Sequence, residues 1–341
     1  MSGKLECSII KNMRTIIEKV NKNELNTEII KEAGRILKEG GLVAFPTETV
    51  YGLGADALNE DAARKIYAAK GRPSDNPLII HITNMDALGK ITRNVSEKAK
   101  KVAQHYWPGP LTMIFDKSEI VPYGTTGGLD TVAVRMPVHD VAKEVIDAGG
   151  GYIAAPSANT SGRPSPTTAQ HVAEDMDGRI DMIVDGGAVD IGVESTILDM
   201  TVDPPMILRP GAVTKEMLEE LIGEIDVDRT LIQPDSKKVP KAPGMKYRHY
   251  APKAELTIVE GNIDQVVCEI NRLTDEKQKE GYKVGIIGTR ETVGRYLYGI
   301  LREFDDDKVD FIYSESFATD GIGSAIMNRL LKAAGHHVIR I

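Results

Sequence analysis

Residues 42–54 read LVAFPTETVYGLG, and this stretch decides the expected fold. Leu42 to Phe45 are a short apolar run of the kind that forms a buried strand. Two threonines and closely spaced glycines follow, and such residues turn easily and expose backbone amides. The stretch therefore predicts a strand that leads directly into a binding loop.

Helices and strands alternate on both sides of this stretch. From Asn26 to Lys38 apolar residues recur at helical spacing, and Gly40-Gly41 provides a stop for an amphipathic helix. Further along, the patterns predict helices over 61–70 and 97–106 and strands over 78–82, 111–115, 131–136, 151–155 and 182–184. Because short strands and helices interleave, the first two thirds of the chain predict one α/β domain with a mixed sheet.

The last third of the chain predicts a second, smaller domain. Between Gly223 and Pro252 the residues Asp, Lys and Pro recur without clear periodicity, as in a linker. Beyond it, the patterns predict strands over 255–259, 284–288 and 309–313 and a helix over 323–334, hence a small three-layer α/β domain with a parallel sheet. The expected division is a domain over 1–223 with an extra N-terminal segment over 1–12, a linker or lid over 224–252, and a C-terminal domain over 253–341.

The composition is that of a globular protein. The 341 residues are 41% hydrophobic and 27% charged, which suffices for one large core and one smaller core. No apolar run approaches bilayer length and residues 1–20 lack a signal-peptide core, so we expect a cytoplasmic location and no membrane partner. Cys7 and Cys268 are too few for a disulfide framework. A net charge of -8 argues against non-specific nucleic-acid binding as the main task.

Two cations stand at the end of the helix predicted over 61–70, in the sequence Lys70-Gly71-Arg72-Pro73. A single surface lysine or arginine usually has no specific role. Here the two lie beside Asn76 and His81, where arginine can donate in a fork and lysine can act as a point charge. Each charge-assisted contact would contribute roughly 1.5–3 kcal/mol, so the pair is a candidate phosphate clamp.

Polar residues also lie on and after the predicted strands. Thr131 and Arg135 share one face of the strand over 131–136, which an edge strand with one side in water explains as well as a site does. Ser157 and Asn159 follow the strand over 151–155 and could make only turn hydrogen bonds. Ligands nevertheless gather at strand ends in α/β sheets, so both segments remain candidates.

Several common catalytic motifs are missing from the sequence. It contains no Gly-x-Ser-x-Gly elbow, no histidine pair at metal-ligand spacing and no Walker-type phosphate loop. These absences argue against hydrolase, metalloenzyme and ordinary P-loop functions. No protein metal site is therefore predicted.

Three motifs together resemble those of the YrdC-type threonylcarbamoyl-AMP synthases: residues 45–54, Lys70-x-Arg72 and Ser157-x-Asn159. Residues 107–112, 192–197 and 208–211 also fit, and residues 244–250 resemble the linker of the two-domain members. The resemblance extends from about Leu25 to the end of the chain. It implies a YrdC-like twisted mixed sheet with flanking helices around a concave cavity, followed by a small Rossmann-like C-terminal domain.

The resemblance implies that L-threonine, bicarbonate and ATP give threonylcarbamoyladenylate and pyrophosphate. The product would serve threonylcarbamoyladenosine formation beside the anticodon of tRNAs reading ANN codons, through hand-over to the tRNA threonylcarbamoyl transferase complex. Mg²⁺ is expected with ATP, held by phosphates and waters, and no organic cofactor or stable nucleic-acid binding is expected. This chemistry requires anions held together in a dry pocket and no protein nucleophile, which suits the cations and hydroxyls above.

The resemblance also assigns residues to two subsites. The expected nucleotide-binding residues are Lys70, Arg72, Asn76, Thr131, Ser157, Asn159, Ser165, Arg209, Lys246 and Tyr250, with Lys70 and Arg72 as the catalytic pair. The expected threonine-binding residues are Thr47, Thr49, His81, Arg135, Ala155 and Ser195. Arg135 would pair with the threonine carboxylate, and Lys246 and Tyr250 would approach the nucleotide as part of a lid.

Two other functions remain open at this point. A concave basic cleft could hold RNA, although the basic residues are not interleaved with aromatic ones, which make up 5% of the chain. A carbamoyl-adenylate enzyme could also use another acceptor, as in hydrogenase maturation proteins. That role normally comes with zinc-finger segments, for which the cysteines here are too few.

Overall fold

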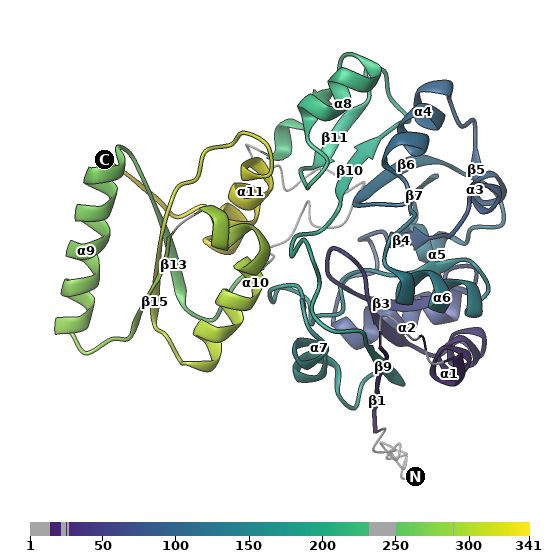
Figure 1. The fold of residues 1–341 in the computed structure, drawn as a ribbon, viewed down its shortest axis with the longest axis horizontal. Helices are drawn as coiled ribbons and strands as arrows, with labels where there is room; N and C mark the ends of the chain where they lie inside the picture. The colour runs from purple at the N-terminus through teal and green to yellow at the C-terminus, as the bar shows by residue number, and fades with distance from the viewer. Residues whose placement is uncertain (1–13, 22–24, 26, 232–249, 289) are drawn as a thin grey trace, which may run out of the picture.

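The structure is a computed structural model that describes residues 14–21, 25, 27–231, 250–288 and 290–341. It contains two sheets, a large one in the first two thirds of the chain and a small one in the last third (Figure 1). The predicted N-terminal segment over 1–12, most of the predicted linker and the candidate Lys246 lie outside the described residues.

The large sheet is mixed, as predicted, and its strands run in the order β1-β9-β2-β3-β8-β4-β7-β6-β10-β11-β12, with β5 paired to β6. The strands are β1 (Ile16–Lys19), β2 (Val43–Pro46), β3 (Tyr51–Asp56), β4 (Ile79–His81), β5 (Thr92–Arg93), β6 (Leu111–Lys117), β7 (Thr131–Arg135), β8 (Ile153–Ala154), β9 (Met182–Asp185), β10 (Thr196–Asp199), β11 (Met206–Arg209) and β12 (Asp226–Val227). The helices are α1 (Thr27–Lys38), α2 (Glu60–Lys70), α3 (Met85–Ile91), α4 (Glu97–Tyr106), α5 (Tyr123–Thr126), α6 (Asp140–Ala148), α7 (Ala169–Met176) and α8 (Lys215–Ile222), with a 3₁₀ turn at Arg229–Leu231.

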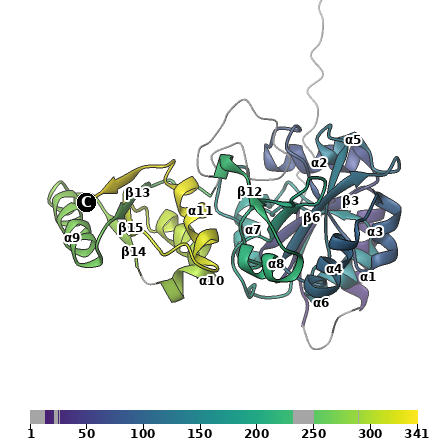
Figure 2. The same cartoon turned by 90° about the horizontal axis from the view of Figure 1, so that it is seen from above.

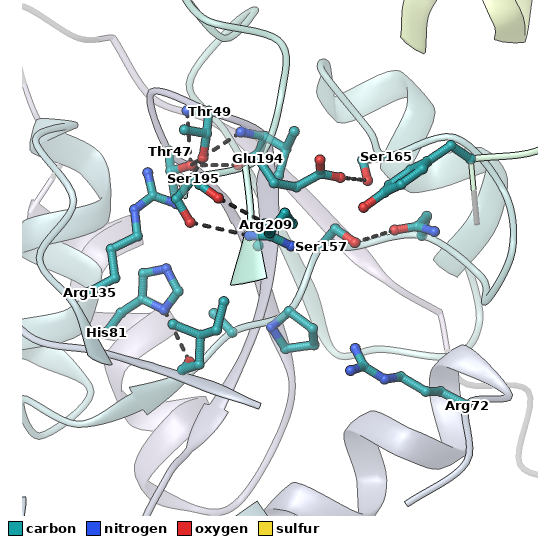
Figure 3. A pocket seen from close by; sticks show the side chains of 17 residues that line it. Thr47, Thr49, Arg72, His81, Arg135, Ser157, Ser165, Glu194, Ser195 and Arg209 are labelled. Atoms are coloured by element: carbon teal, nitrogen blue, oxygen red, sulfur yellow. Dashed lines mark hydrogen bonds between the residues drawn. The ribbon is translucent and has the colours of Figure 1, made fainter. Parts of the chain in front are cut away.

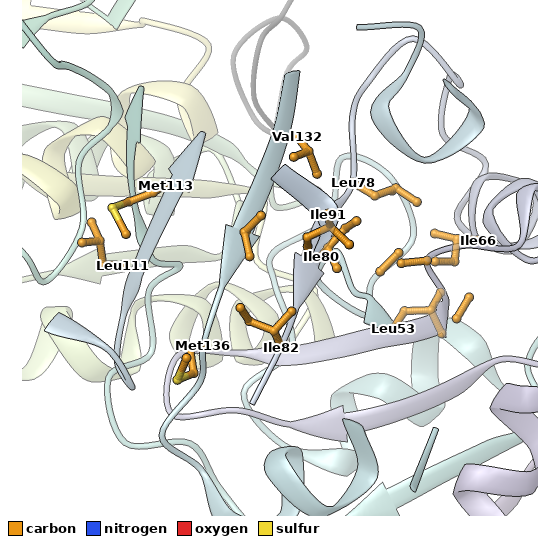
Figure 4. Close-up of a cluster of buried hydrophobic side chains, with 14 of the residues drawn as sticks. Leu53, Ile66, Leu78, Ile80, Ile82, Ile91, Leu111, Met113, Val132 and Met136 are labelled. Atoms are coloured by element: carbon orange, nitrogen blue, oxygen red, sulfur yellow. The ribbon is translucent and has the colours of Figure 1, made fainter. Parts of the chain in front are cut away.

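The central strands of this sheet are buried on both faces, whereas the edge strands β1 and β12 are exposed. Alternate residues of a central strand therefore enter different cores. In β2, Ala44 belongs to the main core, whereas Val43 and Phe45 belong to a second core under α1 and α6. The main core continues across β3, β4, β6 and β7 and includes Leu53, Ile80 and Met113 (Figure 4). The sheet is therefore a rigid, doubly covered platform for the loops at its edge.

Local sequence sets the end of α2, which presents the two predicted cations. Asn59 caps the helix start by accepting from the amides of Asp61 and Ala62. Gly71 ends the helix with φ 61°, a left-handed conformation that glycine adopts at no steric cost. Lys70 is thus the last helical residue, and Arg72 follows the cap.

Two expectations from the sequence require correction. Tyr51–Asp56 is a strand antiparallel to β2, so the loop spans only residues 47–50. The glycines there permit close packing: a Cβ on Gly54 would lie 2.7 Å from Phe45 Cε1. The edge-strand alternative for residues 131–135 is wrong, because β7 lies between β4 and β6.

The C-terminal domain has a fully parallel sheet, as predicted, in the order β14-β15-β13-β16. Its elements are β13 (Glu255–Glu260), α9 (Ile263–Lys279), β14 (Val284–Ile287), α10 (Arg290–Asp306), β15 (Phe311–Glu315), α11 (Gly323–Ala333) and β16 (Val338–Arg340), of which β16 was not predicted. Helices α10 and α11 face the large domain and α9 lies on the far side (Figure 2). None of the described helices has both the length and the apolar character needed to span a membrane.

Candidate functional site

A cavity with about 60 Å³ of free volume lies where the loops of the large sheet meet the C-terminal domain (Figure 3). The residues that line it are Thr47, Thr49, Val50, Gly52, Arg72, Ile79, His81, Arg135, Ala155, Pro156, Ser157, Asn159, Ser165, Glu194, Ser195, Arg209 and Tyr250. They come from segments far apart in the sequence, so the fold assembles the cavity.

The wall formed by the β2–β3 turn, β4 and β7, here called the inner wall, is built around Arg135. Its Nη2 lies 2.6 Å from Glu48 Oε1, its Nη1 donates to Thr49 Oγ1 at 2.8 Å, and its Nε donates to the Gly109 carbonyl at 3.3 Å. Arg135 is the register partner of His81 across β7 and β4, so the two share one face of the sheet. Burial, and then the Arg135 charge, lower the pKa of His81 to about 3, so the imidazole is neutral near pH 7.

Arg72 is buried, and its guanidinium is only partly satisfied. Nη2 donates to the carbonyls of Asn76 and Pro77 at 3.2 Å each. Its buried Nε and the buried Oδ1 of Asn76 have no hydrogen-bond partner among the described residues. Burial lowers the pKa of Arg72 to about 10, so it stays charged near pH 7. A buried cation with a spare donor beside a cavity suits an anionic ligand.

Lys70 does not line the cavity. Its Nζ donates to the carbonyls of Ser157 and Asn159, at 2.5 and 2.6 Å, and burial followed by the Arg72 charge lowers its pKa well below the ordinary value. Ser157 Oγ in turn donates to Asn159 Oδ1 at 2.5 Å. Lys70 therefore supports this loop from behind, and a direct contact with a phosphate would require those hydrogen bonds to break.

The opposite wall, here called the interdomain wall, is built around Glu194. Its Oε1 accepts from Ser165 Oγ at 2.5 Å, and its Oε2 accepts from Tyr298 Oη at 2.7 Å and from Arg329 Nε at 3.0 Å. Burial opposes ionisation of Glu194, but Arg329, Arg209 and the two hydroxyl hydrogen bonds outweigh it and lower its pKa to about 2. The carboxylate is thus charged near pH 7.

Ser195 follows Glu194 and links the two walls. Its Oγ lies 2.8 Å from Thr112 Oγ1 and accepts from Arg209 Nη2 at 3.2 Å, while its carbonyl accepts from Arg209 Nε at 3.1 Å. Burial is the main cause that lowers the pKa of Arg209. Hydroxyls and a cation therefore share one part of the wall.

The structure brings most of the expected site residues together. Those that line the cavity are Thr47, Thr49, Arg72, His81, Arg135, Ala155, Ser157, Asn159, Ser165, Ser195, Arg209 and Tyr250. Lys70 and Asn76 lie directly behind this lining, whereas Thr131 begins β7, four residues from Arg135 and outside the lining.

The sequence did not indicate the roles of Glu194, Tyr298 and Arg329. Glu194 stands within residues 192–197, which fit the family resemblance, but only Ser195 of this segment is expected in the site. Tyr298 and Arg329 lie on helices of the other domain, 104 and 135 residues from Glu194. No local pattern could have linked them to the cavity.

Comparison with known proteins identifies the family to which the chain belongs. A family model described as "Telomere recombination" matches residues 35–211, and one described as "Threonylcarbamoyl-AMP synthase, C-terminal domain" matches residues 213–335. A threonylcarbamoyl-AMP synthase from Pyrococcus abyssi is 50% identical over 326 residues, which are 92% of this chain and 96% of that protein. One from Bacillus subtilis is 49% identical over 352 residues, with 97% and 100% covered.

A solved structure agrees with these matches. The crystal structure of P. abyssi Sua5 complexed with L-threonine is 48% identical and superposes with a TM-score of 0.93, covering 96% of this chain and 100% of that one. Both domains are matched, so the fold, the cavity and the sequence lead to one conclusion. The chain belongs to the threonylcarbamoyl-AMP synthase family, in its two-domain form.

Proposed function

We propose that this protein makes L-threonylcarbamoyladenylate from L-threonine, bicarbonate and ATP, and releases pyrophosphate. The observation that carries the proposal is the cavity itself, which combines buried, charged arginines with hydroxyls and a neutral histidine. The P. abyssi relative whose structure was solved with L-threonine supports the same substrate.

The inner wall is the proposed threonine subsite, formed by Thr47, Thr49, His81, Arg135, Ala155 and Ser195. Glu48 already balances the charge of Arg135, so a threonine carboxylate would share the guanidinium with Glu48. His81 Nδ1 lies 3.2 Å from the Ile79 carbonyl. In the neutral ring Nδ1 donates to this carbonyl and Nε2 is left as an acceptor for the amine or hydroxyl of threonine.

The phosphates are proposed to lie between Arg72 and Arg209, with Ser157, Asn159 and Ser165 as donors. Asn76 would orient Arg72, Lys70 would hold the loop, and Thr131 would contact a part of the nucleotide outside the cavity. Lys246, which is not among the described residues, is also proposed as a nucleotide ligand. Tyr250, which is buried in the wall, would border the nucleotide on the side of the C-terminal domain.

The reaction needs only positioning and charge from these residues. The threonine amine attacks the carbon of bicarbonate, and loss of water gives a carbamate. A carbamate oxygen then attacks the α-phosphorus, and the bond to the β-phosphate oxygen breaks as pyrophosphate leaves with its electrons. Fixed cations stabilise the charge that develops on the phosphates, at no cost in reorganisation.

Magnesium is proposed to arrive with ATP as part of the substrate. No cluster of three His, Cys, Asp or Glu side chains that could hold a metal exists in the described part of the chain. Glu194 is already bonded to Ser165, Tyr298 and Arg329. The described residues therefore do not form a magnesium cage, and the phosphates and waters would hold the ion. Hand-over of the product to a tRNA threonylcarbamoyl transferase complex is also proposed.

The test is pyrophosphate release by the purified protein with ATP, magnesium and bicarbonate. L-Threonine is compared with L-serine, L-valine and no amino acid. We expect release that requires both threonine and bicarbonate. Arg72→Ala should abolish it while the circular dichroism spectrum is unchanged, because a cavity cation contributes more to binding than to folding. Release that is indifferent to threonine would favour another carbamoyl acceptor, and no release, together with RNA binding, would favour the RNA-binding function.

A further inference from the structure

We propose that Tyr298 and Arg329 of the C-terminal domain are positioning residues of the cavity, which act by holding Glu194 in place. This inference rests on the proposed function, since it assigns these residues to the same site. The C-terminal domain would then contribute to the reaction itself, and would do more than cover one side of the cavity.

The contacts of Glu194 carry the first step of the argument. Both carboxylate oxygens are used: one by Ser165 of the large domain, the other by Tyr298 and Arg329 of the C-terminal domain. Tyr298 and Arg329 are both fully buried. Neither side chain lines the cavity, so each acts on it through the residues that it contacts, of which Glu194 is shared by both.

Arg329 also fixes the backbone on either side of the cavity wall. Its Nη2 lies 3.4 Å from the carbonyl of Glu194, which precedes Ser195, and its Nη1 donates to the carbonyl of Pro210, which follows Arg209, at 2.9 Å. The Arg329 guanidinium thus contacts the residue next to Ser195, a proposed threonine ligand, and the residue next to Arg209, a proposed phosphate ligand. Its displacement would disturb both subsites.

Apolar packing joins the same parts. The hydrophobic core of the C-terminal domain includes Val50 and Tyr250, which both line the cavity. The ring of Tyr250 stacks on Tyr298 with centroids 5.3 Å apart, and the Arg329 guanidinium lies 5.7 Å from the Tyr250 centroid. The cavity wall and the core of the second domain are therefore one packed unit.

Charge explains why Glu194 depends on this docking. A buried carboxylate is stable only when it is paired and hydrogen-bonded. The charged and titratable groups that act on Glu194 are Arg329 and Lys332 of α11, Tyr298 of α10, Arg209 of β11, Lys70 of α2, and Tyr250. Arg329 makes the largest favourable contribution to lowering its pKa. Without Arg329, Glu194 would take up a proton at higher pH.

The experiment uses full-length variants in the pyrophosphate assay, with L-threonine binding measured separately as a rise in melting temperature. Tyr298→Phe keeps the ring and removes the hydroxyl. Tyr313→Phe is the matched control, because Tyr313 is buried in the same domain but belongs to a different cluster. We expect Tyr298→Phe to lower kcat/KM about 10-fold or more, in line with a lost hydrogen bond to a charge, and Tyr313→Phe to change it less than 2-fold.

A pH profile separates positioning from a merely structural effect. As the pH is lowered, the activity of Arg329→Gln should fall at a pH at which the unchanged enzyme is still fully active. The reason is that Glu194 without Arg329 is protonated at a higher pH. In the double variant Glu194→Gln/Arg329→Gln this new acid limb should be absent, since the titrating group is gone. A limb that persists in the double variant would overturn the proposal.

Further outcomes keep the two proposals distinct. Equal losses in Tyr298→Phe and Tyr313→Phe would contradict the positioning role. If Arg329→Gln does not fold, Arg329→Lys, which keeps the charge but loses the fork, should show a smaller acid limb, and an unchanged profile would count against the inference. If the unchanged protein binds threonine but releases no pyrophosphate, the proposed function fails. The threonine-induced melting shift of Tyr298→Phe, expected to be reduced, then still tests the positioning role.

Discussion

The cavity has two walls, and each contains a buried glutamate–arginine pair. On the inner wall, Glu48 and Arg135 lie 2.6 Å apart and both are about 5% exposed. On the interdomain wall, Glu194 and Arg329 lie 3.0 Å apart and are 8% and 0% exposed. The chemistry of the two pairs is alike, but the first is contained within one domain and the second crosses between two.

The two walls therefore depend on different contacts for their stability. The inner pair is fixed by the β2–β3 turn and by β7, which both belong to the large sheet, and the C-terminal domain adds a packing contact at Val50 of the turn. The interdomain pair exists only while the C-terminal domain is docked. Loss of the inner pair should therefore affect folding, whereas loss of the interdomain pair should affect docking and catalysis first.

The largest effect is expected from Arg135→Ala. It leaves Glu48 buried without its partner, which typically costs about 3–5 kcal/mol, and we expect this loss in the free energy of unfolding by urea. Threonine-dependent pyrophosphate release should also disappear. The double variant Glu48→Gln/Arg135→Ala is the control and should recover part of the stability, since no unpaired charge remains. A loss of less than 1 kcal/mol in Arg135→Ala would show that the inner pair is dispensable.

The second-largest effect should be on the pH dependence of the free energy of unfolding, which differs between His81 of the inner wall and Glu194 of the interdomain wall. The pKa of His81 is about 3 in the folded protein and 6.5 ordinarily. The unfolded chain thus binds more protons, and stability falls by about 1.4 kcal/mol per pH unit as the pH drops below 6.5. Glu194, with a pKa of about 2 against an ordinary 4.5, loses its contribution only below pH 4.5. His171, whose pKa is about 4, titrates alongside His81.

The check is urea unfolding between pH 7 and pH 4 for His81→Gln, His171→Gln and the double variant. Each single variant should flatten the fall between pH 6.5 and 4.5, and the double variant should flatten it most. The fall below pH 4.5 should remain in all three. An unchanged slope in His81→Gln would mean that this imidazole is charged in the folded protein.

Gly192→Ala should weaken mainly the interdomain wall, although the Gly192 amide also donates to the Thr49 carbonyl of the inner wall. A Cβ on Gly192 would lie 2.0 Å from the Arg295 carbonyl oxygen of α10, and its φ of 80° is strained for alanine. We expect a cost of about 1–3 kcal/mol and, in calorimetry, separate melting of the C-terminal domain. Gly223→Ala is the matched control, because Gly223 has φ 85° but open space around it. Equal effects of the two variants would assign the loss to backbone strain instead of domain contact.

The smallest effects should come from removing one hydroxyl group on each wall. Thr49→Val removes an acceptor of Arg135 and a partner of Thr47, and Ser165→Ala removes a donor to Glu194. Each should lower the free energy of unfolding by about 1 kcal/mol. Thr49→Val should mainly raise the KM for threonine, and Ser165→Ala mainly the KM for ATP. The same KM rising in both variants would contradict the division into two subsites.

Sequence patterns predicted much of this architecture. The mixed sheet, the parallel C-terminal sheet and the helix over 97–106 are confirmed, because each depends on local periodicity and end signals. Strand β3 was missed because its glycines resemble a turn, whereas they permit contact with Phe45. Local patterns describe which residues turn easily, and not which backbones lie close together in the fold.

The interdomain wall lay beyond sequence reasoning for a different reason. The resemblance to a known family, which is carried by motifs of the large domain, implied most of the residues that line the cavity. Tyr298 and Arg329 belong to helices whose other residues build an ordinary hydrophobic core. Only the docking of two separately folded sheets shows that these side chains meet Glu194.

The long separation between Glu194 and Arg329 has a consequence for protein synthesis. Arg329 leaves the ribosome 135 residues after Glu194, when the large sheet has already been translated. Until then Glu194 has only the partners that its own domain supplies, the Ser165 hydroxyl and the Arg209 charge. The interdomain wall is therefore the last part of the cavity to gain its contacts, after α10 and α11 have been translated.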